Sequence, residues 1–138
     1  MAVKAKELRF AVEIDGNGRT SAESGTAVDV PEDWEAEHLV LAGLVRCTLK
    51  SFRYAASRRG VAGGGSGRAR GTVTRRADGS YAFVEITVEL EVEVDAIPAD
   101  GVNGLVAHAQ RGCFVGNSFS TKPRYRWTVN GAPVASPA

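Results

Sequence analysis

A long apolar stripe in the middle of the chain constrains the fold more than any other feature of the sequence. Pro31 and the acidic residues after it suit the first turn of a helix, and the sequence Arg58-Arg59-Gly60 suits its end. This pattern predicts a helix from about residue 31 to residue 59, the longest and most central element. Its buried face follows the i, i+3, i+4, i+7 spacing and consists of Leu41, Leu44, Val45, Thr48, Leu49, Phe52 and Ala55.

A different periodicity precedes this helix. Apolar side chains occupy every second position from Leu8 to Ile14, as in a strand with one buried face. The sequence DGNG at 15–18 supplies residues that tolerate a positive φ, which a tight reversal needs. We therefore expect an N-terminal hairpin, with a return strand over 19–23 and a short extended piece over 26–30.

A glycine-rich stretch, VAGGGSG at 61–67, follows the helix. Loops of this composition can hold phosphate groups, but this one lacks the Lys-Ser/Thr ending of a P-loop and does not follow a strand. The composition favours a flexible loop over 61–67.

Two antiparallel strands are expected next, over 68–76 and 81–95, with the reversal at 78–79. A two-residue turn at that point sets Arg68 opposite Glu89, so opposite charges meet on one face. The other face of the second strand must pack on the long helix because it is an unbroken apolar row of Val84, Ile86, Val88, Leu90, Val92 and Val94.

The remaining pattern predicts a short helix over 102–112, a last strand over 124–129 and a tail over 131–138. Strands and helices in this order indicate an α+β fold, with antiparallel sheets packed on a long central helix. The length of 138 residues predicts a single domain over 1–138, with an ordered core over about 8–130.

Composition excludes several classes of function. Seventeen Lys and Arg against sixteen Asp and Glu give a net charge of +1 without a long run of one sign, so no nucleic-acid partner is expected. The first ten residues interleave charges, unlike a secretory signal, and no stretch approaches the roughly 20 apolar residues of a membrane span. We expect a cytoplasmic protein that does not bind membranes. The two histidines and two cysteines lack metal-ligand spacing, so no metal site is expected.

The two cysteines, Cys47 and Cys113, can be inert core residues or a redox pair. Gly43 lies one turn before Cys47 and either leaves room for a substrate or allows a second helix to approach. A nucleophilic cysteine must be a thiolate, and Cys47 lies too far along its helix for the helix dipole to favour that state. A cation is needed instead. Arg46, Lys50 and Arg19 are candidates, and we favour a residue brought in from elsewhere in space.

Two segments resemble the OsmC/Ohr family of peroxidases. Residues 37–47 (EHLVLAGLVRC) are similar to the family motif in which an acid precedes a helical cysteine by ten residues. Residues 109–115 (AQRGCFV) are similar to its second cysteine motif, and the order of elements matches from about residue 8 to residue 130.

The resemblance implies an OsmC-like fold, an intertwined homodimer and a thiol-dependent peroxidase that acts on small organic hydroperoxides. It implies that Cys47 becomes a sulfenic acid and that Cys113 resolves it as a Cys47–Cys113 disulfide. Glu37 matches the acid that holds an arginine near the thiolate, and Arg19 is the nearest match to that arginine. No bound cofactor is expected. The resemblance implies an external dithiol reductant, which we expect to be of the lipoyl type. The alternative is a non-catalytic OsmC-like dimer that binds a small apolar ligand or a partner.

Overall fold

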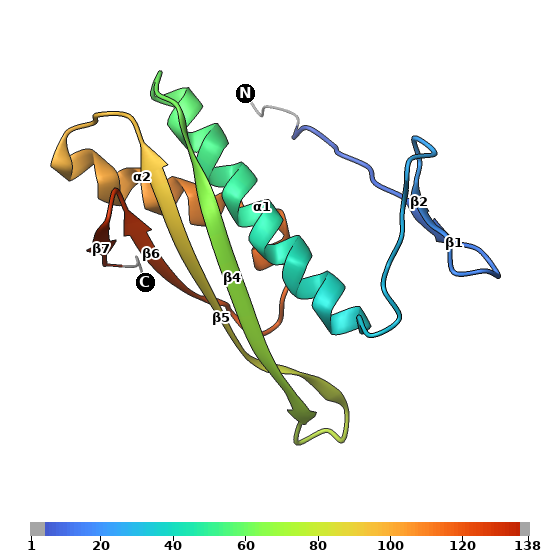
Figure 1. The fold of residues 1–138 in the computed structure, drawn as a ribbon. Coiled ribbons are helices and arrows are strands. Elements are labelled where there is room, and N and C mark those ends of the chain that lie inside the picture. Colours follow the sequence, from blue (N-terminus) through green and yellow to red (C-terminus); the bar gives the residue numbers. More distant parts are fainter. Residues whose placement is uncertain (1–4, 136–138) are drawn as a thin grey trace. The chain divides into compact units, whose positions relative to one another are not determined.

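The computed structural model describes residues 5–135, which divide after Glu35 into two compact units. The first unit holds a three-stranded antiparallel sheet in the order β1-β2-β3 (Figure 1). The reversal between its first two strands is a turn in which the Asp15 side chain accepts hydrogen bonds from the amides of Asn17 and Arg19. The predicted reversal is confirmed, and the strands are β1 (Val12–Ile14), β2 (Thr20–Ala22) and β3 (Ala27–Val28). The first strand is shorter than the predicted 8–14, and the apolar side chains expected on a buried face are exposed.

The second unit is a four-stranded sheet in the order β4-β5-β6-β7 with a long helix, α1, along it (Figure 1). The sequence therefore folds as the predicted α+β class. Its elements are α1 (Ala36–Arg58), β4 (Gly63–Arg75), β5 (Tyr81–Val94), α2 (Ala99–Arg111), α3 (Phe114–Asn117), β6 (Arg124–Val129) and β7 (Ala132–Val134).

The hydrophobic core lies in this second unit. The predicted stripe of α1 is confirmed, with Leu44, Phe52 and Ala55 fully buried. Helix α1 begins at residue 36 and not at 31, because a turn closed by the Trp34 amide and the Pro31 carbonyl precedes it. The buried side chains that surround the stripe come from β5, α2 and β6: Ile86, Val88, Leu90, Val92, Val94, Leu105, Val106, Ala109, Trp127 and Val129.

The long hairpin of β4 and β5 has the predicted pairing of Arg68 with Glu89, whose side chains form an ion pair at 3.1 Å. The turn itself is longer than the predicted two residues, since the Arg76 amide bonds to the Ser80 carbonyl. A register shift between residues 72 and 73 compensates for this length. The shift also turns Val84 outward, so this residue was wrongly predicted to belong to the core row.

The glycine-rich stretch corrects the prediction of a flexible loop at 61–67. Residues 63–67 are the first part of β4 and pair with β5 over its last residues. A side chain at Gly63 would press on Phe52, and one at Gly67 would press on Val45, both of α1. The glycines therefore allow a close approach of strand and helix, which composition alone does not reveal.

The C-terminal strands differ from the prediction in two ways. Strand β6 pairs parallel to β5, because the connection through α2 and α3 returns the chain to the same end of the sheet. Residues 132–134 of the predicted tail form β7. Asn130 and Gly131, with φ of 51° and 81°, make the two-residue turn that joins it to β6. No helix within residues 5–135 is long and apolar enough to cross a membrane.

The glycine positions give a test of the strand. Gly65→Ala places a methyl group on the Glu91 carbonyl, and we expect a loss of about 1–3 kcal/mol in the free energy of unfolding. At the neighbouring Gly64, a methyl group makes only ordinary contacts with Arg53, so Gly64→Ala serves as the control and changes stability by less than about 0.5 kcal/mol. Urea denaturation measures both. Equal stability of the two variants would indicate a loop.

Candidate active site

The fold brings the two cysteines together. Cys47 lies partly buried on α1, and Cys113 lies fully buried between α2 and α3. Their thiols lie near enough for each to influence the other electrostatically, and they are not joined in a disulfide. The pair combines one sulfur that solvent can reach with one that it cannot.

Cys113 is held in place by the ends of two helices. Helix α2 ends at Gly112, whose amide bonds to the His108 carbonyl at 3.0 Å, and Cys113 then adopts an extended conformation. Its carbonyl accepts the Asn117 amide of α3 at 3.0 Å. Ser51 of α1 donates to the Ala109 carbonyl at 2.7 Å and so ties this junction to the helix that carries Cys47.

The surroundings of Cys47 oppose ionisation. Burial raises the pKa of the Cys47 thiol, and the neighbouring Cys113 raises it further. The backbone amides of Val115 and Phe114 act in the opposite direction because they donate hydrogen bonds to the Cys47 sulfur. The net pKa of Cys47 is raised, so the second unit by itself keeps this residue as a thiol at neutral pH.

Two hydroxyl groups at the site were missed by the sequence analysis. Thr48 Oγ1 lies 3.3 Å from Cys113 Sγ and donates to the Leu44 carbonyl at 2.8 Å. The Tyr125 hydroxyl lies in the same small space beside Gly116 as Cys113 Sγ, and burial is the largest cause that holds the pKa of Tyr125 above its usual range. The pattern placed Thr48 in the apolar stripe and Tyr125 in a strand. A hydroxyl residue at a buried stripe position was the available signal.

The other predicted site residues are not brought to the thiols within one unit. Glu37 is exposed in the first turn of α1, ten residues or about 15 Å along the axis from Cys47. Arg19 is exposed in the first unit, and Arg46 and Lys50 are exposed on α1. Gly43 leaves open space, since nothing lies within 4 Å of a side-chain carbon placed there.

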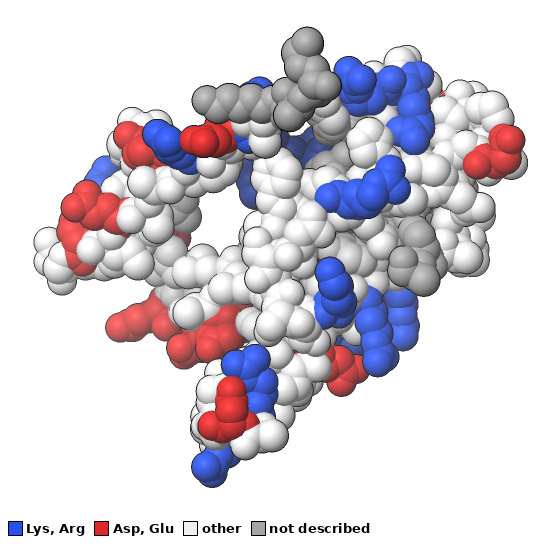
Figure 2. Space-filling model, turned by 180° about the vertical axis from the view of Figure 1, so that it is seen from behind, with Lys and Arg blue, Asp and Glu red and all other residues white. Residues whose placement is uncertain are grey.

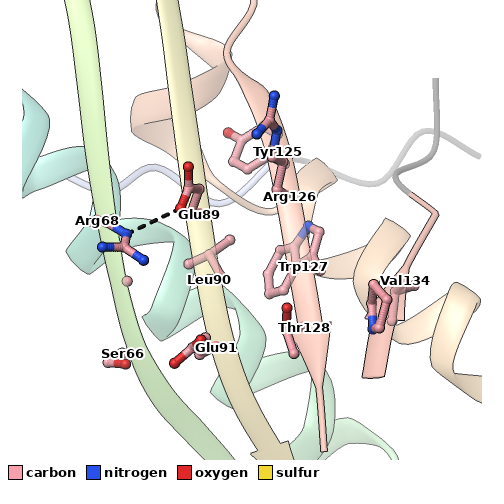
Figure 3. A pocket seen from close by; sticks show the side chains of 12 residues that line it. Ser66, Arg68, Glu89, Leu90, Glu91, Tyr125, Arg126, Trp127, Thr128 and Val134 are labelled. Carbon is pink, nitrogen blue, oxygen red and sulfur yellow. Dashed lines mark hydrogen bonds and ion pairs between the residues drawn. The ribbon is translucent and has the colours of Figure 1, made fainter. Parts of the chain in front are cut away.

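A wide groove of about 780 Å³ lies elsewhere, on the sheet face that is turned away from the core (Figure 3). Charged side chains of neighbouring strands line it, with Arg68 and Glu89 paired across it. Neither cysteine is part of its lining. Figure 2 shows basic and acidic side chains on the same face of the molecule, in keeping with the nearly balanced charge. No cluster of three potential metal ligands occurs among residues 5–135.

Comparison with known proteins adds to this geometry. The family model described as OsmC-like protein matches residues 30–128. The chain belongs to the OsmC-like family. No curated protein sequence matches the chain.

Solved structures of this family share the fold. One is an organic hydroperoxide resistance protein OsmC from Legionella pneumophila, 17% identical, with a TM-score of 0.59 over 91% of this chain and 98% of that one. A second is the organic hydroperoxide resistance protein OhrB of Bacillus subtilis, 14% identical, with a TM-score of 0.57 over 87% and 96%. A third is the organic hydroperoxide resistance protein from Elizabethkingia anophelis, 15% identical, with a TM-score of 0.63 over 91% and 98%. At sequence identities this low, the structural similarity shows a common fold and nothing further.

The different exposure of the two thiols predicts selective alkylation. Iodoacetamide added to the native reduced protein should label Cys47 first, because Cys113 has no exposed surface. Both thiols should react after unfolding in urea. Peptide mass spectrometry assigns the label, and the Cys47→Ser variant is the control that should stay unlabelled under native conditions. Faster native labelling of Cys113 would contradict the described burial.

Proposed function

We propose that this protein is a thiol-dependent peroxidase that reduces organic hydroperoxides. The observation that carries the proposal is the proximity of Cys47 and Cys113 within an OsmC-like fold, with only the first residue partly exposed to solvent. The organic hydroperoxide resistance proteins that share the fold support a peroxide-related redox role.

The proposed cycle uses both sulfurs. The Cys47 thiolate attacks the outer oxygen of the hydroperoxide, the O–O bond breaks, and the alkoxide takes up a proton and leaves as an alcohol. Cys113 then attacks the Cys47 sulfenic acid. An S–S bond forms, the S–O bond breaks, and the hydroxyl group leaves as water with the proton of Cys113. An external dithiol, which we propose to be of the lipoyl type, reduces the disulfide and returns both thiols.

Exposed apolar side chains on α1, which carries Cys47, and on α3 favour an alkyl hydroperoxide over hydrogen peroxide. Phe114, whose amide donates to the Cys47 sulfur, has a side chain that is 58% exposed. Leu39 and Val40 of α1 are also exposed, at 42% and 39%. Together with the open space beside Gly43, these side chains offer an apolar surface on which an alkyl group can bind.

Activation of Cys47 then requires a cation from outside the second unit, because that unit raises the pKa of the thiol. We propose that Arg19 supplies this charge and that Glu37 orients it, in a homodimer. Phe10, Val12 and Ile14 of the first unit are 65–79% exposed, and we propose that a second copy of the chain covers them. A cytoplasmic location would keep both thiols reduced between cycles.

The peroxidase is tested by counting thiols. Reduced protein mixed with cumene hydroperoxide should lose both thiols and form a Cys47–Cys113 disulfide. Cys47→Ser should abolish peroxide consumption. Cys113→Ser should still consume peroxide and should accumulate the sulfenic acid and then the sulfinic acid of Cys47. Wild-type protein that keeps both thiols at millimolar peroxide would favour the alternative, a non-catalytic dimer that binds an apolar ligand or a partner.

The role of Arg19 has its own test. Arg19→Ala should lower the rate of peroxide reduction at pH 7 by at least about tenfold, because the thiolate fraction falls tenfold for each unit by which the pKa of Cys47 rises. The pH–rate profile should move to higher pH for the same reason. Arg9→Ala is the matched control, since Arg9 lies in the same unit, is exposed and pairs only with Glu7 in the described residues. Identical profiles for both variants and the wild type would exclude Arg19 as the activating cation.

A further inference from the structure

The sulfur of Cys113 has an unusual environment for a fully buried cysteine. It is surrounded by three polar groups, which are the Thr48 hydroxyl at 3.3 Å, the Tyr125 hydroxyl and the Cys47 thiol. These groups come from α1 and β6, two elements far apart in the sequence. The convergence of two hydroxyl groups on one buried sulfur is therefore a product of the tertiary fold.

Side-chain packing alone does not require the hydroxyl groups of Thr48 and Tyr125. Valine has nearly the shape of threonine, and phenylalanine that of tyrosine, so apolar side chains could fill both positions. A buried hydroxyl is tolerated only when it is hydrogen-bonded, and none of the buried side-chain oxygen or nitrogen atoms in residues 5–135 lacks a partner. The Thr48 hydroxyl donates to the Leu44 carbonyl and keeps its oxygen lone pairs directed at Cys113 Sγ, 3.3 Å away.

The backbone is shaped to admit the tyrosine. Gly116 of α3 is buried, and a side-chain carbon at this position would overlap the Tyr125 hydroxyl and come within 3.3 Å of Cys113 Sγ. Glycine at 116 therefore makes the space in which the Tyr125 hydroxyl reaches the sulfur.

We propose that Tyr125 and Thr48 are catalytic hydrogen-bonding residues for the second chemical step, the attack of Cys113 on the oxidised Cys47. This inference rests on the proposed thiol chemistry and deepens it. Because Cys113 is sealed from water, negative charge that develops on its sulfur during the attack must be stabilised by the groups it touches. The Tyr125 hydroxyl, which shares the space beside Gly116 with this sulfur, is placed to donate to it during the attack. Thr48 donates its own proton to the Leu44 carbonyl, so its oxygen faces Cys113 Sγ at 3.3 Å as an acceptor and holds the sulfur in line.

The proton balance of the step does not involve Tyr125. The S–S bond forms, the S–O bond of the sulfenic acid breaks, and the Cys113 proton ends on the departing water. The pKa of Tyr125 is held above its usual range, which suits a group that donates a hydrogen bond and keeps its proton throughout.

The decisive experiment separates the two chemical steps in a single turnover. Reduced protein is mixed with one equivalent of cumene hydroperoxide, and samples are quenched and weighed by intact mass spectrometry. Tyr125→Phe should consume peroxide within about twofold of the wild-type rate and form the disulfide about tenfold more slowly, as expected for one lost transition-state hydrogen bond. Sulfenic acid, trapped with dimedone, should accumulate in between.

Matched variants distinguish chemistry from packing. Thr48→Val should slow disulfide formation, and Thr48→Ser, which keeps the hydroxyl, should restore it. Gly116→Ala should act like Tyr125→Phe, since it displaces the hydroxyl without removing it. Tyr81→Phe is the control, because Tyr81 is 72% exposed at the start of β5. If Tyr125→Phe does not fold, the Thr48 pair carries the test.

Diamide separates this inference from the peroxidase proposal. The reagent adds through its N=N bond to a thiol, and attack by a second thiol forms the disulfide and releases the hydrazine. If the wild type ignores peroxide but forms the disulfide with diamide, and Tyr125→Phe accumulates the diamide adduct, the peroxidase proposal fails and this inference holds. Equal rates of disulfide formation in the wild type, Tyr125→Phe and Thr48→Val would overturn the inference, as would the absence of disulfide with both oxidants.

Discussion

The close packing of α1 on the sheet is the constraint on which the rest of the second unit depends. Gly63 and Gly67 bring β4 against Phe52 and Val45 of the helix, at distances that leave no room for a side chain on the strand. With its position fixed in this way, α1 presents its partly buried side, including Cys47, to α3. The position of Cys47 relative to Cys113 therefore depends on this packing, which involves Val45, two residues before Cys47, and Phe52, five residues after it.

Local periodicity predicted those parts of the fold that local chemistry decides. The stripe of α1 and the pairing of Arg68 with Glu89 both follow from residue spacing, and both are confirmed. Arg68 still pairs with Glu89 although the predicted turn was too short, because the register shift near residue 72 adds one residue on β5. Val84 is that additional residue, and it faces outward. A bulge depends on how the whole hairpin twists, and an alternating pattern of side chains does not reveal it.

The site was predictable to a smaller extent. Cys47 and Cys113 were named from their motifs, but a sequence does not show that Thr48 and Tyr125 reach the same sulfur. Both residues fit the apolar periodicity of their elements, so the pattern predicted core positions for them. Glu37 and Arg19 show the opposite case. Their proposed roles depend on contacts beyond the second unit, and helix geometry alone keeps Glu37 about 15 Å from Cys47 along the axis of α1.

The two sulfurs differ in the charge that the proposed chemistry requires beside them. Within the second unit both have uncharged polar neighbours, backbone amides for Cys47 and hydroxyl groups for Cys113. Such groups stabilise a thiolate that forms briefly during a reaction, but for Cys47 they do not outweigh burial, since its pKa remains raised. Cys113 needs to become anionic only while it attacks its neighbour, so uncharged hydroxyl groups suffice for it. In the proposed peroxidase, Cys47 must already be a thiolate when the peroxide binds. The proposed cycle therefore requires a full positive charge at Cys47 and not at Cys113, whereas none of the groups that shift the pKa of Cys47 in the described residues is a cation.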